Sequence, residues 1–106
     1  MAEKVSRNHY SDFVAHMIRF YISCPDGIPV QSHTRAEVNN WIAAQAVFAD
    51  LDAEEARLLT DIYRRKNLPF PEAVKLCAKV HCVKENEAWK LVTRVSARIA
   101  RVRGLV

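Results

Sequence analysis

The chain has 106 residues, a formal net charge of +4, and a composition that is 50% apolar and 26% charged. This length supports one hydrophobic core without metal or disulfide staples, and two glycines and four prolines argue against disorder and against a many-turned β fold. The sequence has no apolar run near the ~20 residues that span a bilayer and no N-terminal segment resembling a signal peptide. We therefore expect one cytoplasmic domain, residues 1–106, with no membrane partner.

The basic residues are concentrated in the second half of the chain. Residues 1–50 contain four Lys or Arg and five Asp or Glu, whereas residues 51–106 contain twelve and seven. Such a polarity is typical of a nucleic-acid-binding face. Lysine and arginine also suit helix C-termini and solvated surfaces, so charge alone leaves a structural interpretation open.

Two amphipathic helices are predicted first, and we interpret residues 10–49 as scaffold helices. The first should run from about Tyr10 until Pro25 stops it, after a frayed, aperiodic segment at residues 1–8. The second should begin at Thr34, whose side chain can form a capping box with Glu37. The residues expected to face inward are Tyr10, Phe13, Val14, Met17 and Tyr21, then Val38, Trp41, Ile42, Phe48 and Ala49. The residues expected to face away in the second helix are Asn39, Asn40, Ala43 and Val47.

Two shorter helices are predicted next. One should begin at Asp52, which can form a second capping box with Glu55, and close at the basic run 64–66. That run complements a helix C-terminus, with a binding site as the alternative. The other should span Pro71 to Val80, because proline suits a first helical turn. The residues expected to face inward are Ala56, Leu59, Ile62 and Tyr63, then Ala73, Leu76, Cys77 and Val80.

A long final helix should begin near Lys84, after a turn at residues 81–83. Its apolar residues recur at three- and four-residue steps: Ala88, Leu91, Val92, Val95, Ile99 and Val102. Lys90, Arg94, Arg98 and Arg101 recur in the same way, roughly 120° round the helix. We expect this cationic flank to be open to solvent and free to lie along a polyanion.

Five helices with short connections predict an all-α domain, and residues 51–105 have the layout of a helix-turn-helix. The residues expected to contact DNA are Lys75, Lys79, Lys84, Glu85, Asn86, Glu87, Lys90, Arg94, Arg98 and Arg101. Lys, Asn and Glu at the start of the last helix can read base edges, and the remaining cations can hold phosphates. The same layout also describes any αα-hairpin, and Glu85 and Glu87 would repel phosphates unless each points at a base or a basic neighbour.

From Leu51 to Leu105 the chain resembles the promoter-reading C-terminal region of bacterial sigma factors and the sigma-like phage regulators. The residues that carry this resemblance are Glu54-Glu55, Leu58-Leu59, Ile62-Tyr63, Cys77, Val80, Val83-Lys84, Ala88, Leu91 and Arg94. It implies a transcription regulator in which Lys84–Glu87 and Lys90 contact duplex DNA. The turn departs from the family, because it lacks glycine and is one residue longer. Residues 10–48 would serve as a scaffold or would dock RNA polymerase or a second copy of the chain.

Other chemistries lack support in the sequence. No Gly-rich phosphate loop, His-Glu-x-x-His or nucleophile elbow is present, so we expect no enzyme and no cofactor. Cys77, His81 and Cys82 lie close together without a paired fourth ligand, so no zinc site is predicted, and the three cysteines should be free thiols. One alternative is a protein-interaction module that uses the face bearing Trp89, Ser96 and Arg103 without binding nucleic acid. RNA binding is a further alternative.

Overall fold

The computed structural model describes residues 2–24, 26–29 and 32–105, with side chains from residue 12 onward within these ranges. This part of the chain is all-α and contains no strand, as predicted. Its helices are α1 (Ala2–Ser23), α2 (Arg35–Ala49), α3 (Ala53–Arg64), α4 (Phe70–Val80) and α5 (Glu85–Arg103). The predicted five-helix order with a long last helix is confirmed.

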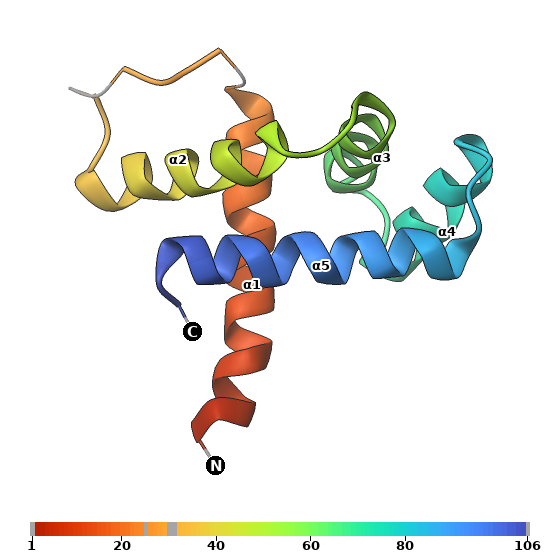
Figure 1. Ribbon diagram of the computed structural model, residues 1–106, viewed down its shortest axis with the longest axis horizontal. Helices are drawn as coiled ribbons and strands as arrows, with labels where there is room; N and C mark the ends of the chain where they lie inside the picture. The colour runs from red at the N-terminus through yellow and green to blue at the C-terminus, as the bar shows by residue number, and fades with distance from the viewer. Residues whose placement is uncertain (1, 25, 30–31, 106) are drawn as a thin grey trace.

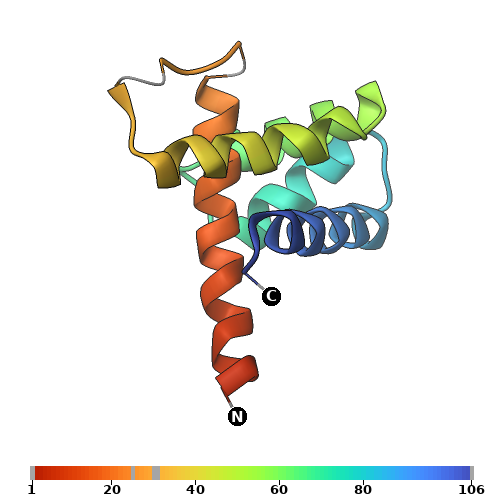
Figure 2. The same cartoon turned by 60° about the vertical axis from the view of Figure 1, so that its left-hand side comes forward.

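The helices pack around α5. In Figure 1, α2 and α5 cross the same side of α1, and α3 and α4 lie toward the N-terminal end of α5. α5 contacts each of the other four helices, and α1 contacts α2, α3 and α5. In both views the N-terminal half of α1 projects beyond the rest of the fold (Figures 1 and 2). The last helix is therefore a central element of the domain, with only part of its circumference left for a partner.

The starts of α2 and α3 follow the predicted capping signals. Thr34 Oγ1 accepts a hydrogen bond from Glu37 N at 3.1 Å, and Glu37 Oε1 accepts one from Thr34 N at 2.9 Å. Asp52 and Glu55 make the equivalent pair of bonds at 2.8 and 3.2 Å. Both predicted capping boxes are confirmed, and each satisfies two amides that a helix start would otherwise leave unpaired.

The start of α1 was predicted wrongly. The helix begins at Ala2 and so includes residues 2–8, which we expected to fray. These residues lack an apolar stripe, but several of them are good helix formers, and propensity alone does not require amphipathicity. The helix ends at Ser23, close to the predicted stop. The side chains of Tyr10 and Ser11, and the whole of Pro25, lie outside the described residues.

Of the residues predicted to face inward on α2, only Phe48 is buried. The buried residues of α2 are Asn40, Ala43, Ala44, Val47 and Phe48. Ile42 is 50% exposed, Ala49 is exposed, and Val38 and Trp41 are half-buried. α2 contacts both α1 and α5, and small side chains on its inner face let the three backbones approach closely. Steric fit between helices therefore outweighs the larger transfer energy of isoleucine at this position.

In α3 and α5 the residues predicted to face inward are buried, apart from Ala56 and Val102. Individual residues depart from the prediction in α1, α4 and α5. In α1, Val14, Met17 and Ile18 are fully buried, whereas Phe13 is 37% exposed. In the other two helices, residues that were predicted to face inward are instead exposed: Leu76 (39%), Val80 (57%) and Val102 (54%). The residues buried in their place are Val74, Ala78 and Ala100. Alanine thus contributes more to these interfaces than a ranking by hydrophobicity predicts.

Candidate nucleic-acid interface

The connection between α4 and α5 is a four-residue turn built on a left-handed cysteine. Cys82 has φ = 58°. Its amide donates to Lys79 O at 3.2 Å, and Val83 N donates to Ala78 O at 2.8 Å. This pair of bonds is the Schellman ending, in which glycine usually takes the left-handed position. The turn therefore forms without glycine, and it extends through Lys84, the N-cap of α5.

Polar contacts fix the start of this turn to α3. His81 Nε2 lies 3.0 Å from Asp61 Oδ2, and Arg65 Nε lies 3.2 Å from Asp61 Oδ1. Burial alone would raise the pKa of Asp61, but hydrogen bonds from His81 and Arg65 outweigh it and leave that pKa below its ordinary value. Arg65 Nε also donates to Cys77 Sγ at 3.2 Å. Burial raises the pKa of the Cys77 thiol, so this cysteine is a protonated core residue and not a nucleophile.

The residues expected at the front of the interface are solvent-exposed. They are Lys75 and Lys79 on α4, the N-cap Lys84, and Glu85, Asn86 and Glu87 in the first turn of α5. Among the described side chains, the three lysines form no ion pair. Glu85 accepts from Trp89 Nε1 at 3.4 Å, and Glu87 pairs with Lys90 Nζ at 3.3 Å. The two carboxylates that would oppose phosphates thus have partners on their own helix.

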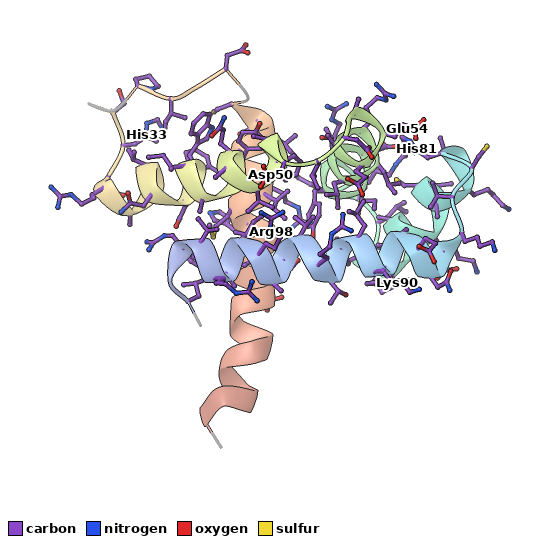
Figure 3. All side chains as sticks on the ribbon, in the orientation of Figure 1. His33, Asp50, Glu54, His81, Lys90 and Arg98 are labelled. Carbon is purple, nitrogen blue, oxygen red and sulfur yellow. The ribbon has the colours of Figure 1, made fainter. Side chains whose placement is uncertain are left out.

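The cationic flank of α5 is not free, contrary to the expectation from the sequence. Besides the Lys90–Glu87 pair, Arg94 Nη2 lies 2.9 Å from Glu55 Oε2, and Arg98 Nη2 lies 2.7 Å from Asp50 Oδ2. Figure 3 shows Asp50 at the end of α2 directed toward Arg98 on α5. The acids come from the end of α2 and the first turn of α3, which lie beside α5. Arg101 is exposed and forms no ion pair among the described side chains.

The α3 side of α5 is acidic. A concavity of about 290 Å³ opens there between the start of α3 and α5. The residues that line it are Asp52, Glu54, Glu55, Leu58, Val83, Glu87, Lys90, Leu91 and Arg94. Four carboxylates and two cations give this surface a net negative charge, which disfavours a DNA phosphate. Any polyanion should therefore approach from the α4 side of the turn.

The face of α5 that the protein-interaction alternative requires is used within the chain. The Trp89 ring packs edge-on against Phe70 at 5.8 Å. Burial raises the pKa of Tyr63, and the neighbouring Ser96 side chain partly offsets this rise. On the same face, Arg103 Nε donates to Asn40 Oδ1 at 2.6 Å. Trp89, Ser96 and Arg103 are half-buried, so contacts within the chain partly cover the face that was expected to meet a partner chain.

The described residues include few features that point to other chemistry. In this part of the chain, no three His, Cys, Asp or Glu side chains are grouped so as to hold a metal ion. None of its helices combines the length and apolar character needed to cross a membrane. The three cysteines are free thiols, as predicted, but only Cys77 is buried, and Cys82 is exposed.

No protein-family model matches this sequence, and no match was found among curated proteins or among solved structures.

Proposed function

We propose that this protein binds duplex DNA through the α4–α5 pair and acts as a transcription regulator. The observation that carries the proposal is the exposed corner formed by α4, the turn and the first turn of α5. This corner carries three lysines, Lys75, Lys79 and Lys84. None of them has a carboxylate partner among the described side chains. They lie next to a helix start whose polar side chains are solvent-exposed, as in a helix-turn-helix.

Each side chain at the corner has a chemical role in this proposal. Lys75, Lys79 and Lys84 would hold phosphates, which position the protein without reading sequence. Asn86 lies in the first exposed turn of α5, where a side-chain amide can pair with the N6 and N7 edge of adenine. Lys90 could reach guanine only by leaving Glu87, a surface pair of the kind that contributes only about 0–1 kcal/mol.

The proposal is narrower than the one drawn from the sequence. That proposal required Lys90, Arg94 and Arg98 to be free, and this requirement is not met. Because the paired acids would remain near any phosphate that displaced them, Arg94 and Arg98 should add little affinity. We therefore assign the phosphate contacts to the corner lysines and expect affinity in the range of non-specific DNA binding, roughly 10⁻⁴ to 10⁻⁶ M at physiological salt.

The other helices would support this corner. α1 and α2 hold α5 through its apolar face, and the projecting half of α1 is left for a protein partner (Figure 2). RNA polymerase or a second copy of the chain would take that place if the regulator works as sigma-like proteins do.

Charge reversal with a matched control tests the proposal. Fluorescence anisotropy would follow a labelled mixed-sequence duplex titrated with wild type, with Lys75→Glu/Lys79→Glu, or with Arg35→Glu/Arg57→Glu. The control pair is also exposed and changes the net charge equally. We expect the α4 variant to lose at least about tenfold in affinity, and the control to lose much less. Equal losses would show that only net charge matters, and absence of binding by the wild type would refute the proposal.

A further inference from the structure

The basic run at the end of α3 is divided between two sides of the helix. Arg65 turns toward Asp61 and Cys77. Arg64 and Lys66 instead line a concavity of about 340 Å³ at the junction of α1 and α3. The residues around this space are Arg19, Ile22, Ser23, Tyr63, Arg64 and Lys66. Three cations therefore border one cavity whose described lining includes no acid.

Arg19 is held in place before any ligand arrives. Its Nε donates to Tyr63 O at 3.2 Å, and its Cζ lies 5.8 Å from the centre of the Tyr63 ring. This leaves the four N–H groups on the two Nη atoms, which have no carboxylate partner among the described residues. A restrained guanidinium loses little conformational entropy on binding, and its fork matches the geometry of phosphate.

The positive charge of Arg19, Arg64 and Lys66 is larger than the charge needed to neutralise the nearby helix C-termini. α1 and α3 both end at the junction, at Ser23 and Arg64, and each helix C-terminus carries roughly half a negative charge. The three cations carry a charge of +3 and the two helix ends together about −1, which leaves an excess of about +2. The Tyr63 carbonyl is satisfied by Arg19 alone. The excess is therefore available to an anion from solution.

An apolar space adjoins the cationic one. A second concavity, of about 260 Å³, is lined by Tyr21, Ile22, Phe48, Ala56, Thr60 and Arg64. It shares Ile22 and Arg64 with the first, and its two aromatic rings lie 5.1 Å apart. A ligand that spans both spaces would place an anionic group on the cations and a flat group against aromatic edges.

We propose that the α1–α3 junction is a binding site for a nucleoside phosphate. The phosphate lies among Arg19, Arg64 and Lys66, and the base lies beside Tyr21 and Phe48. This site is distinct from the α4–α5 corner and does not depend on DNA binding there.

The test titrates adenosine 5′-monophosphate, inorganic phosphate and adenosine into the ¹⁵N-labelled full-length chain at low ionic strength. We expect the nucleotide to bind more tightly than phosphate, adenosine to give no saturable shift, and the amides of Ser23, Arg64 and Lys66 to move. Arg64→Gln/Lys66→Gln removes two exposed side chains and should weaken the nucleotide by about tenfold or more, through lost charge-assisted hydrogen bonds. Lys75→Gln/Lys79→Gln should leave nucleotide binding unchanged.

The same variants separate this proposal from the one for DNA. The Arg64/Lys66 variant should bind duplex nearly as wild type does, and the α4 variant should not. Equal affinity for the nucleotide and adenosine would overturn the phosphate site, as would undiminished nucleotide binding by Arg64→Gln/Lys66→Gln. Displacement of the nucleotide by duplex DNA would assign the junction to a polynucleotide backbone and would also overturn the proposal.

Discussion

Arg98 donates a hydrogen bond from Nη2 to Asp50 Oδ2 at 2.7 Å and so joins residues that lie 48 positions apart in the chain. Arg94 makes a second long-range bridge to Glu55, 39 residues away, at 2.9 Å. The two bridges tie α5 to the C-cap of α2 and to the first turn of α3. They occupy two of the four residues of the cationic flank with contacts inside the domain, which limits where a polyanion can bind.

Releasing these arginines should strengthen DNA binding. Asp50→Asn/Glu55→Gln removes both acids, while glutamine still completes the capping box at the start of α3. We expect the affinity for a labelled duplex to rise about tenfold at low salt, because two cations become available to phosphates. The free energy of unfolding should fall by no more than about 1–2 kcal/mol, because each exposed ion pair contributes about 0–1 kcal/mol.

A matched double variant separates release of the arginines from a change in net charge. Glu54→Gln/Glu72→Gln removes two exposed acids that form no ion pair among the described side chains. This control should raise affinity only slightly in the same assay. An equal rise in both variants would show that the Arg94 and Arg98 pairs do not limit binding.

The contact between Arg103 and Asn40 should matter for stability. Asn40 is only 8% exposed, and its side-chain oxygen accepts from Arg103 Nε at 2.6 Å. Arg103→Met leaves this buried acceptor unpaired, so the free energy of unfolding should fall by about 1–3 kcal/mol in urea denaturation. Arg101→Met, on the exposed side of the same turn, should change it by less than about 0.5 kcal/mol. Similar losses in the two variants would contradict the contact.

The starts of α2 and α3 and the inner faces of α3 and α5 were largely predictable, whereas the inner face of α2 was not. Capping boxes depend on residues three positions apart, and so Thr34–Glu37 and Asp52–Glu55 were correctly read from the sequence. The inner face of α2 depends on which helices pack against it. Ala43 and Ala44 are buried there while Ile42 is half exposed, an arrangement that no pattern within α2 reveals.

Replacing Cys82 with glycine should stabilise the fold. The left-handed conformation at φ = 58° costs an L-residue roughly 1–2 kcal/mol, whereas glycine loses about 0.5–1 kcal/mol more chain entropy on folding. We expect Cys82→Gly to raise the free energy of unfolding by about 0.5–1 kcal/mol. Cys82→Ala keeps the Cβ atom and should leave the free energy of unfolding nearly unchanged. A destabilised glycine variant would argue against the left-handed turn.

Asp61 should make the protein sensitive to acid. Its pKa lies below the ordinary value of 3.8 in the fold, because hydrogen bonds from His81 and Arg65 outweigh the opposing effect of burial. A lowered pKa stabilises the fold above about pH 4, and this contribution is lost as the pH falls through the folded value. Asp61→Asn should therefore lower the free energy of unfolding by about 1–2 kcal/mol at pH 7.

The test of the Asp61 contacts is how the difference in unfolding free energy between wild type and Asp61→Asn depends on pH. Urea denaturation of wild type and Asp61→Asn between about pH 7 and pH 3 should show the two curves converging below pH 4. Glu72→Gln, an exposed control, should run parallel to the wild type. A constant gap between wild type and Asp61→Asn across this range would contradict the assigned hydrogen bonds.

The candidate site was predictable where exposure depends on local position, and not where it depends on the packing of distant helices. The exposure of Lys75 and Lys79 follows from their place on the polar side of the short helix α4, and Lys84 is exposed at the N-cap of α5. The acid partners of Arg94 and Arg98 could not be foreseen, because they lie 39 and 48 residues away and are brought close only by the packing of α2 and α3 on α5. A basic stripe read from sequence alone therefore overstates the charge available to a ligand.

The slope of duplex affinity against salt concentration tests the corner lysines most directly. Each neutralised phosphate contributes about −0.9 to the slope of log K against log salt, so three lysines predict a slope of about −2.7. Lys75→Gln/Lys79→Gln should reduce its magnitude by about 1.8, whereas Arg35→Gln/Arg57→Gln should leave it unchanged. A slope that is the same in the wild type and the α4 variant would contradict DNA binding at this corner.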